Sequence, residues 1–146
     1  MVEEGIKELQ RRFKRLGLAI IRMTEKLPNW RAANVIPNQI LRSGTSPGAN
    51  YRGACRARSN AEFVAKLGIV EEELDETLYW LEVLVEADFL AQKDADPLTK
   101  EGNELLGIVV ASIRTARRSP PDDQNAECGM RNWSRRPRRT WDYVCK

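Results

Sequence analysis

The sequence predicts an all-α protein: an antiparallel up-down four-helix bundle over residues 1–118, followed by a disordered, basic C-terminal extension over residues 119–146. Three observations predict it. Apolar residues recur every three or four positions in four segments, as on a helix with one buried face. Short polar or proline-containing connections separate these segments, which favours antiparallel neighbours. The periodicity stops after Arg118, where few aliphatic residues follow.

The first helix is predicted over residues 2–26. Its apolar face follows a seven-residue pattern made by Ile6, Leu9, Phe13, Leu16, Ile20, Met23 and Leu27. The opposite side carries five cations: Lys7, Arg11, Lys14, Arg15 and Arg22. Two interpretations are open, a solvated charged face and a stripe that binds phosphates.

The second helix is predicted from an N-cap at Asn34, with Pro37 in its first turn, to about Arg58. Its middle is rich in Ser, Thr, Gly, Pro and Asn, which are poor helix formers, so packing must specify it. Polar and small residues repeat there at four-residue spacing. We expect a hydrogen-bonded polar ridge between helices or subunits, and a glycine face that admits a close neighbour or a second subunit. The residues of this motif are Arg42, Ser43, Gly44, Ser46, Gly48, Asn50 and Tyr51.

The third helix is predicted over residues 61–87 after a cap at Ser59-Asn60, and the fourth over residues 97–118 with Asp96 as N-cap and Pro97 first. The third helix has an acidic outer face and the clearest heptad run, made by Phe63, Leu67, Val70, Leu74, Thr77, Leu81 and Leu84. Trp80, flanked by Tyr79 and Val83, widens its apolar edge and is a second candidate subunit contact.

Composition excludes several kinds of chemistry. The chain has no histidine, so histidine-based triads and histidine-ligated metals are impossible, and we expect no enzymatic activity, cofactor or metal. Three cysteines at no metal spacing indicate a reducing compartment, and we expect a cytoplasmic protein. No apolar run reaches the roughly 20 residues of a membrane span.

Charge is strongly segregated along the chain. Residues 1–58 contain twelve Lys or Arg and four acids, a net +8, whereas residues 59–96 contain two and eleven, a net −9. This predicts pairing between helices or subunits, with a basic face left over that would bind nucleic acid. The cations of helix 1 would be joined there by Arg52, Arg56 and Arg58. In the extension, five arginines interleave with Trp133 and Trp141, a pattern open to two interpretations, a grip on single-stranded nucleic acid and an extension of no fixed role.

Two stretches resemble a known family. Residues 35–52, VIPNQILRSGTSPGANYR, and residues 63–82, FVAKLGIVEEELDETLYWLE, are similar to the central motifs of the bacterial 23S rRNA intervening-sequence proteins. The likeness extends over about residues 5–118; Pro37 and Pro47 depart from the family pattern, and the extension has no counterpart in it. The resemblance implies a left-handed bundle that assembles as a homopentamer around a channel, without catalytic residues. Founding members are encoded within insertions in ribosomal RNA genes. A distant relative, the accessory variability determinant of diversity-generating retroelements, binds reverse transcriptase and nucleic acid.

The sequence therefore predicts a non-enzymatic oligomeric bundle that binds RNA or DNA through helices 1 and 2. The alternative is a protein-interaction scaffold or adaptor whose basic patch serves an acidic protein, such as a reverse transcriptase.

Overall fold

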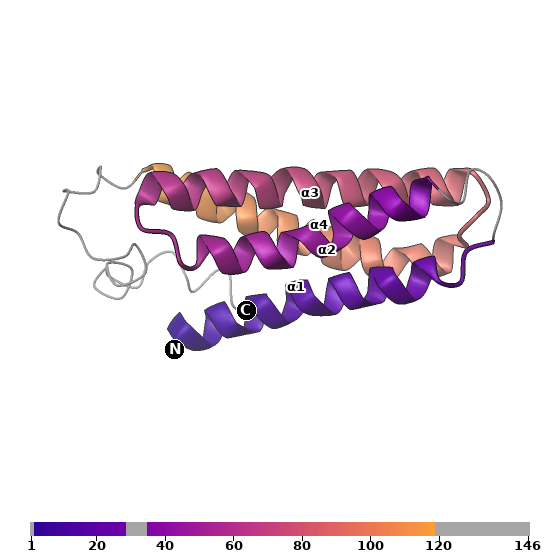
Figure 1. Ribbon diagram of the computed structural model, residues 1–146, viewed down its shortest axis with the longest axis horizontal. Coiled ribbons are helices and arrows are strands. Elements are labelled where there is room, and N and C mark those ends of the chain that lie inside the picture. Colours follow the sequence, from indigo (N-terminus) through magenta and orange to yellow (C-terminus); the bar gives the residue numbers. More distant parts are fainter. Residues whose placement is uncertain (1, 29–34, 119–146) are drawn as a thin grey trace.

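The structure, a computed structural model, describes residues 2–28 and 35–118. It contains four helices: α1 (Val2–Thr24), α2 (Ile36–Ala54), α3 (Asn60–Glu86) and α4 (Gln92–Arg117). Consecutive helices run in opposite directions and are joined at alternate ends of the molecule (Figure 1). The predicted all-α bundle is confirmed. The C-terminal extension lies outside the described residues, so its predicted disorder stays a prediction.

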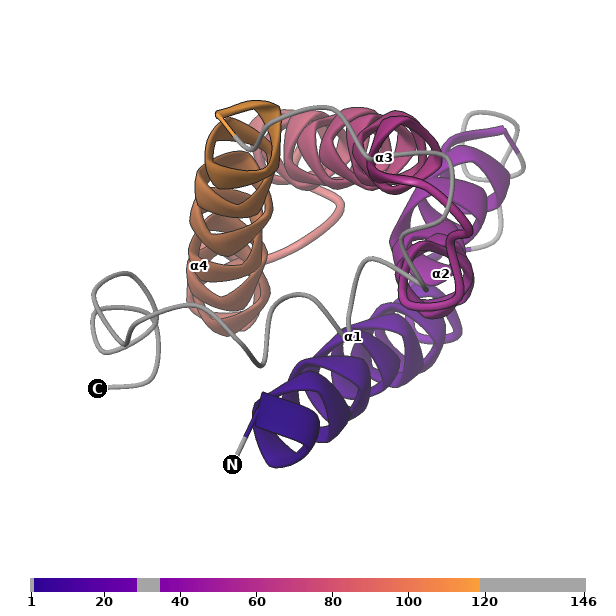
Figure 2. The same cartoon turned by 90° about the vertical axis from the view of Figure 1, so that its left-hand side faces the viewer.

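The helices follow one another around the bundle in chain order. Seen from one end, α1 lies beside α2, α2 beside α3 and α3 beside α4 (Figure 2). The seam between α1 and α4 is the sparsest of the four. The core between the helices is made by apolar residues that recur every three or four positions, among them Phe13, Leu16, Ile20, Ile40, Leu67, Val70, Leu74, Leu81, Leu84, Leu105, Val109 and Ile113.

Both ends of α3 are held by local hydrogen bonds. At the start, Ser59 is the predicted N-cap, and its side chain accepts a hydrogen bond from the backbone N–H of Glu62. At the end, Asp88 has a φ of 59°, which places it in the left-handed region that favours glycine. The N–H groups of Asp88 and Phe89 donate to the carbonyls of Val85 and Leu84. This pairing is a Schellman motif, and it turns the chain towards α4.

The predicted start of the fourth helix is wrong. We expected Asp96 as N-cap and Pro97 as the first residue, but α4 begins at Gln92, with Ala91 as N-cap and Pro97 inside the helix. Pro97 removes one hydrogen bond of the helix. The earlier start is stabilised because Ala95 is buried in the bundle and the side chain of Gln92 donates to Asp96 across one turn at 2.6 Å.

Helix α2 also differs from its prediction at both ends. Its N-cap is Val35, which makes no side-chain capping bond, and Asn34 lies outside the described residues. Pro37 is in the first turn as expected and lacks one of the N–H groups that a cap would satisfy. The helix ends at Ala54 rather than Arg58, because residues 55–59 turn the chain into α3 while Cys55 and Ala57 stay buried.

Candidate nucleic-acid interface

Three of the five cations predicted on helix 1 are paired with acids of the same helix. Lys7 lies 2.8 Å from Glu3, while Arg11 and Arg15 lie 2.8 and 2.9 Å from the two carboxylate oxygens of Glu8. The hydrogen bond from Lys7 lowers the pKa of Glu3, and the hydrogen bond from Arg11 lowers the pKa of Glu8. These exposed pairs reduce the charge that α1 offers to a ligand.

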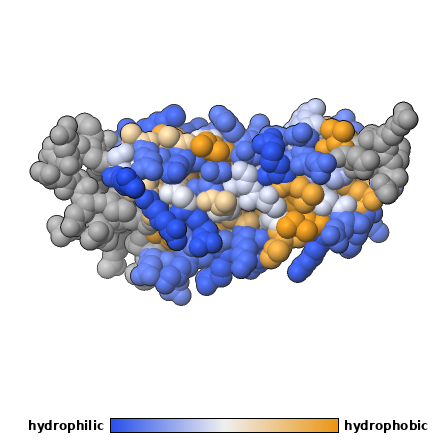
Figure 3. Space-filling view, in the orientation of Figure 1, coloured by the Kyte–Doolittle hydropathy of each residue, from blue (hydrophilic) through white to orange (hydrophobic). Residues whose placement is uncertain are grey.

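Lys14 and Arg22 are exposed and form no ion pair within the part of the chain that the structure describes. Leu18 lies between them, one helical turn from each, and 41% of it is exposed. Apolar surface gathers over the same C-terminal half of α1, beside α2 (Figure 3). The unpaired part of the predicted stripe is therefore partly apolar.

The structure brings Arg52 of α2 close to Lys14 of α1. Phe13 stacks on Tyr51 with ring centroids 4.8 Å apart, and a Cβ on Gly48 would lie 3.6 Å from the Cβ of Phe13. Lys14 comes directly after Phe13, and Arg52 comes directly after Tyr51. The two cations therefore lie at the same level along the α1/α2 seam. Arg52, Arg56 and Arg58 are all exposed, and their side chains have no ion pair among the described residues. We call Lys14, Arg22 and Arg52 the side stripe.

Arg12 is a cation that the sequence analysis did not single out. It bridges the sparse α1/α4 seam, with Nε 2.8 Å from Glu101 and Nη2 2.8 and 2.7 Å from Glu101 and Glu104. The hydrogen bond from Arg12 lowers the pKa of Glu101, and the same bond raises the pKa of Arg12. Arg12 lies three residues after the core residue Leu9 and three residues before the outer cation Arg15, so it is at the edge of the core face of α1. This spacing is the sequence signal that distinguishes Arg12 from the outer cations.

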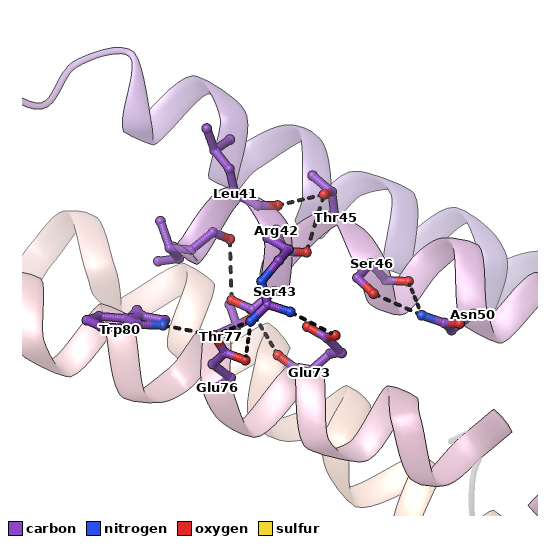
Figure 4. A network of polar contacts seen from close by, with 11 residues as sticks. Leu41, Arg42, Ser43, Thr45, Ser46, Asn50, Glu73, Glu76, Thr77 and Trp80 are labelled. Carbon is purple, nitrogen blue, oxygen red and sulfur yellow. Dashed lines mark hydrogen bonds and ion pairs between the residues drawn. The ribbon is translucent and has the colours of Figure 1, made fainter. Parts of the chain in front are cut away.

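In the predicted polar ridge of α2, Arg42 faces α3, whereas Ser46 and Asn50 bond to each other within α2. Arg42 Nη2 lies 2.6 and 2.7 Å from the carboxylate oxygens of Glu76, and Nη1 lies 3.3 Å from Glu73 (Figure 4). The indole N–H of Trp80 donates to the same Glu76 carboxylate at 3.2 Å. One oxygen of Glu73, Oε2, is buried without a hydrogen-bond partner among the described residues. Glu76 is thus the main partner of Arg42.

Two buried hydroxyls lie beneath this ion pair. Ser43 on α2 and Thr77 on α3 are 3.1 Å apart in hydrogen-bond contact, and Thr77 also donates to the carbonyl of Glu73 at 2.8 Å. Both are completely or almost completely buried. Further along the ridge, Asn50 donates to the side chain of Ser46 at 2.9 Å (Figure 4). These contacts are internal to one chain and satisfy polar groups that burial would otherwise penalise.

The glycine face is also internal. A Cβ on Gly44 would lie 3.0 Å from two side-chain carbons of Ile20, and a Cβ on Gly17 would lie 3.4 Å from the carbonyl oxygen of Gly44. The predicted close approach is therefore real, but its partner is α1. Of the two predicted neighbours, a close helix and a second subunit, the structure shows the first: α1 of the same chain packs on Gly44 and lies beside Gly48, and a contact with another subunit stays a prediction.

Near the C-terminal end of α2, neither Tyr51 nor Cys55 is an exposed reactive group. Tyr51 and Cys55 are buried together, and burial raises the pKa of both side chains. Both therefore remain protonated at neutral pH. Among the described residues, no three acidic or cysteine side chains are grouped to hold a metal ion, and no helix is long and apolar enough to cross a membrane.

Known proteins resemble this chain both in its fold and in its central motifs. None of the curated proteins compared with the chain matches it. A crystal structure of a protein with unknown function from the S23 ribosomal protein family of Bacteroides thetaiotaomicron VPI-5482 is similar, with a TM-score of 0.70 and 31% identity. The match covers 75% of this chain and 97% of that one. A family model described as 23S rRNA-intervening sequence protein matches residues 8–111, from α1 to α4 and including both quoted motifs. The chain therefore belongs to the 23S rRNA-intervening sequence protein family.

Proposed function

We propose that this protein is a non-enzymatic, oligomeric helical bundle that binds RNA or DNA through the basic face of α1 and α2. The observation that carries the proposal is the side stripe: Lys14, Arg22 and Arg52 are exposed and unpaired among the described residues, and they lie within residues 1–58, which have a net charge of +8. Unpaired cations bind phosphates by releasing counterions, whereas cations already paired with Glu3 or Glu8 gain less. The family name, which refers to 23S rRNA, agrees with such a ligand.

Binding of this kind reads phosphates rather than bases. The face is a helical surface of isolated cations, so it offers positioning contacts and no recognition helix for a groove. We expect affinity for structured RNA and duplex DNA that depends weakly on sequence and steeply on salt.

The test is a fluorescence anisotropy titration with an RNA hairpin and a DNA duplex at low salt. The variant Lys14→Gln/Arg22→Gln/Arg52→Gln should bind more weakly and with a flatter salt dependence. On duplex DNA the log–log slope should change by about 0.9 for each phosphate that the variant no longer neutralises. The control Lys93→Gln/Lys100→Gln removes two exposed cations of α4, outside the proposed face of α1 and α2, and should bind as the wild type does. Absence of binding by the wild type at low salt would refute the function.

Self-association is part of the proposal. Tyr79 on α3 is 56% exposed and packs edge-on against Trp80, with ring centroids 5.0 Å apart. An exposed aromatic edge is a common subunit contact. The family resemblance suggests five subunits. Light scattering should give a multiple of the 16.7 kDa chain mass for the wild type and a lower mass for Tyr79→Ser. A wild-type monomer at micromolar concentration would contradict this part.

The alternative function is an adaptor that presents the same cations to an acidic protein, with a reverse transcriptase as one candidate. The exposed apolar Leu18 between Lys14 and Arg22 favours it, because protein interfaces combine apolar centres with charged rims. Pull-downs with and without nuclease separate the two. A partner that stays bound after nuclease treatment, together with no direct RNA binding, would favour the adaptor.

A further inference from the structure

A second group of arginines collects at one end of the bundle. The C-terminal end of α2, the N-terminal end of α3 and the C-terminal end of α4 all lie at the left of Figure 1. The side chain of Asn60, the first residue of α3, donates to the carbonyl of Ala116 in α4 at 2.9 Å. This bond places the α2–α3 connection directly against the last turn of α4.

These segments bring together, at one end of the bundle, arginines that are about 60 residues apart in sequence. The end cluster consists of Arg56 and Arg58 from the α2–α3 connection and Arg114, Arg117 and Arg118 from the end of α4. All five side chains are exposed, and none forms an ion pair among the described residues. The side stripe, in contrast, offers three such cations.

One acid at this end, Glu62, already has partners. Glu62 accepts a hydrogen bond from the backbone N–H of Arg58 at 2.8 Å, and its other oxygen lies 3.8 Å from Lys66. On α1, which begins at the same end, Glu3 pairs with Lys7, whereas Glu4 is exposed and has no ion pair among the described residues. The carbonyls that end α4 are partly satisfied as well, since Asn60 binds that of Ala116 and the N–H of Arg118 binds that of Thr115.

The surface suits a polyanion better than a folded protein partner. The large apolar residues that are strongly exposed among the described residues lie elsewhere: Leu18, Ile21, Val35, Ile69 and Tyr79. A protein interface usually has an apolar centre, whereas a phosphate backbone needs only several separated cations. Arginine is also the side chain best suited to phosphate, because its planar guanidinium donates several hydrogen bonds.

We propose that the end cluster is a phosphate-backbone binding surface for RNA or DNA, and that α4 contributes to nucleic-acid binding through Arg117 and Arg118. This inference rests on the proposed function and extends the interface from the side of α1 and α2 around the end of the bundle. The sequence continues beyond Arg118 with Arg131, Arg135, Arg136, Arg138 and Arg139, so the full chain adds further cations after this end.

The test compares two variants of the full-length chain that each lose three positive charges. The end variant is Arg58→Gln/Arg117→Gln/Arg118→Gln, and the side variant is Lys14→Gln/Arg22→Gln/Arg52→Gln. Titration of a fluorescent RNA hairpin and DNA duplex from 50 to 200 mM salt gives affinity and log–log slope. The end variant should bind at least about tenfold more weakly at low salt, with a duplex slope reduced by about 2 to 3. Circular dichroism checks that each variant is folded, and the Arg→Lys triple at the same end positions should restore most of the binding.

Each outcome decides the inference. If the end variant binds no worse than Lys93→Gln/Lys100→Gln while the side variant binds weakly, the end cluster is not an interface and the proposed function stands. If the Arg→Lys triple is as weak as the end variant, the loss is not electrostatic and the inference is overturned. If the wild type binds neither probe at 50 mM salt, both proposals fail.

Discussion

The Nη2 atom of Arg42 on α2 lies 2.6 and 2.7 Å from the two carboxylate oxygens of Glu76 on α3. Directly beneath, the hydroxyls of Ser43 and Thr77 meet across the same seam. The most unusual stretch of the sequence thus serves as a polar contact between neighbouring helices. Its side chains hold α2 against α3 and so support the fold.

Arg42→Ala should lower the stability of the bundle more than it lowers affinity for RNA. It removes the cation shared by two carboxylates and leaves Glu76 and the partly buried Glu73 without it. The urea midpoint should fall further than for Lys100→Ala, which removes an exposed cation that has no ion pair among the described residues. A variant with an unchanged midpoint and weakened RNA binding would show instead that Arg42 belongs to the interface.

Gly44→Ala should destabilise the protein by about 1–3 kcal/mol, because the added methyl group meets Ile20, which is completely buried and cannot move aside. Gly107→Ala is the matched control. Gly107 is exposed in α4 with open space around it, so alanine there should stabilise by up to about 1 kcal/mol. Thermal unfolding of both variants tests the contact, and equal stabilisation by the two substitutions would argue against a close α1/α2 approach.

Arg12→Gln should cost about 1 kcal/mol at neutral pH, and the cost should shrink in acid. Arg12 lowers the pKa of Glu101 from its ordinary value of 4.5. A lowered folded-state pKa stabilises the protein above the unfolded value, and this stabilisation is lost as the pH falls through the folded pKa. Urea unfolding at pH 7 and pH 3 measures the difference between wild type and variant. A gap of the same size at both pH values would mean that packing, and not charge, holds the α1/α4 seam.

Asp88→Gly should stabilise the protein by roughly 1 kcal/mol, because glycine adopts the left-handed conformation of this position without the steric cost that Asp incurs. Asp75→Gly is the control, because Asp75 is exposed within α3 and glycine there should cost about 0.5 kcal/mol. Chemical denaturation compares the two. Destabilisation by Asp88→Gly would indicate that its carboxylate contributes more than its backbone costs.

The heptad pattern was sufficient to predict the helices because a buried face repeats along each helix. It predicted Leu67, Leu74 and Leu81 in the core, together with the buried Thr77. The N-terminus of α4 could not be predicted in this way. An Asp-Pro pair is a good helix start locally, but burial of Ala95 extends the helix further back.

The sequence also could not predict which side chains form ion pairs between helices. Whether Arg12 meets Glu101, or Arg42 meets Glu76, depends on the rotation and register of two packed helices. The same limit applies to Gly44, whose spacing predicted a close neighbour but could not say that this neighbour is α1. The end cluster could not be predicted without the arrangement of the helices, because Arg58 and Arg117 lie at the same end only when α2, α3 and α4 are packed together.

The most direct test of nucleic-acid binding is the salt dependence of RNA binding by the wild-type protein. The protein would be purified in high salt to remove bound nucleic acid and then titrated with a fluorescent RNA hairpin at 50, 100 and 200 mM salt. With several unpaired cations in contact with phosphates, we predict binding at 50 mM and a linear log–log plot with a slope of about −3 or steeper. No binding at 50 mM salt, or an affinity that does not change with salt, would contradict the account.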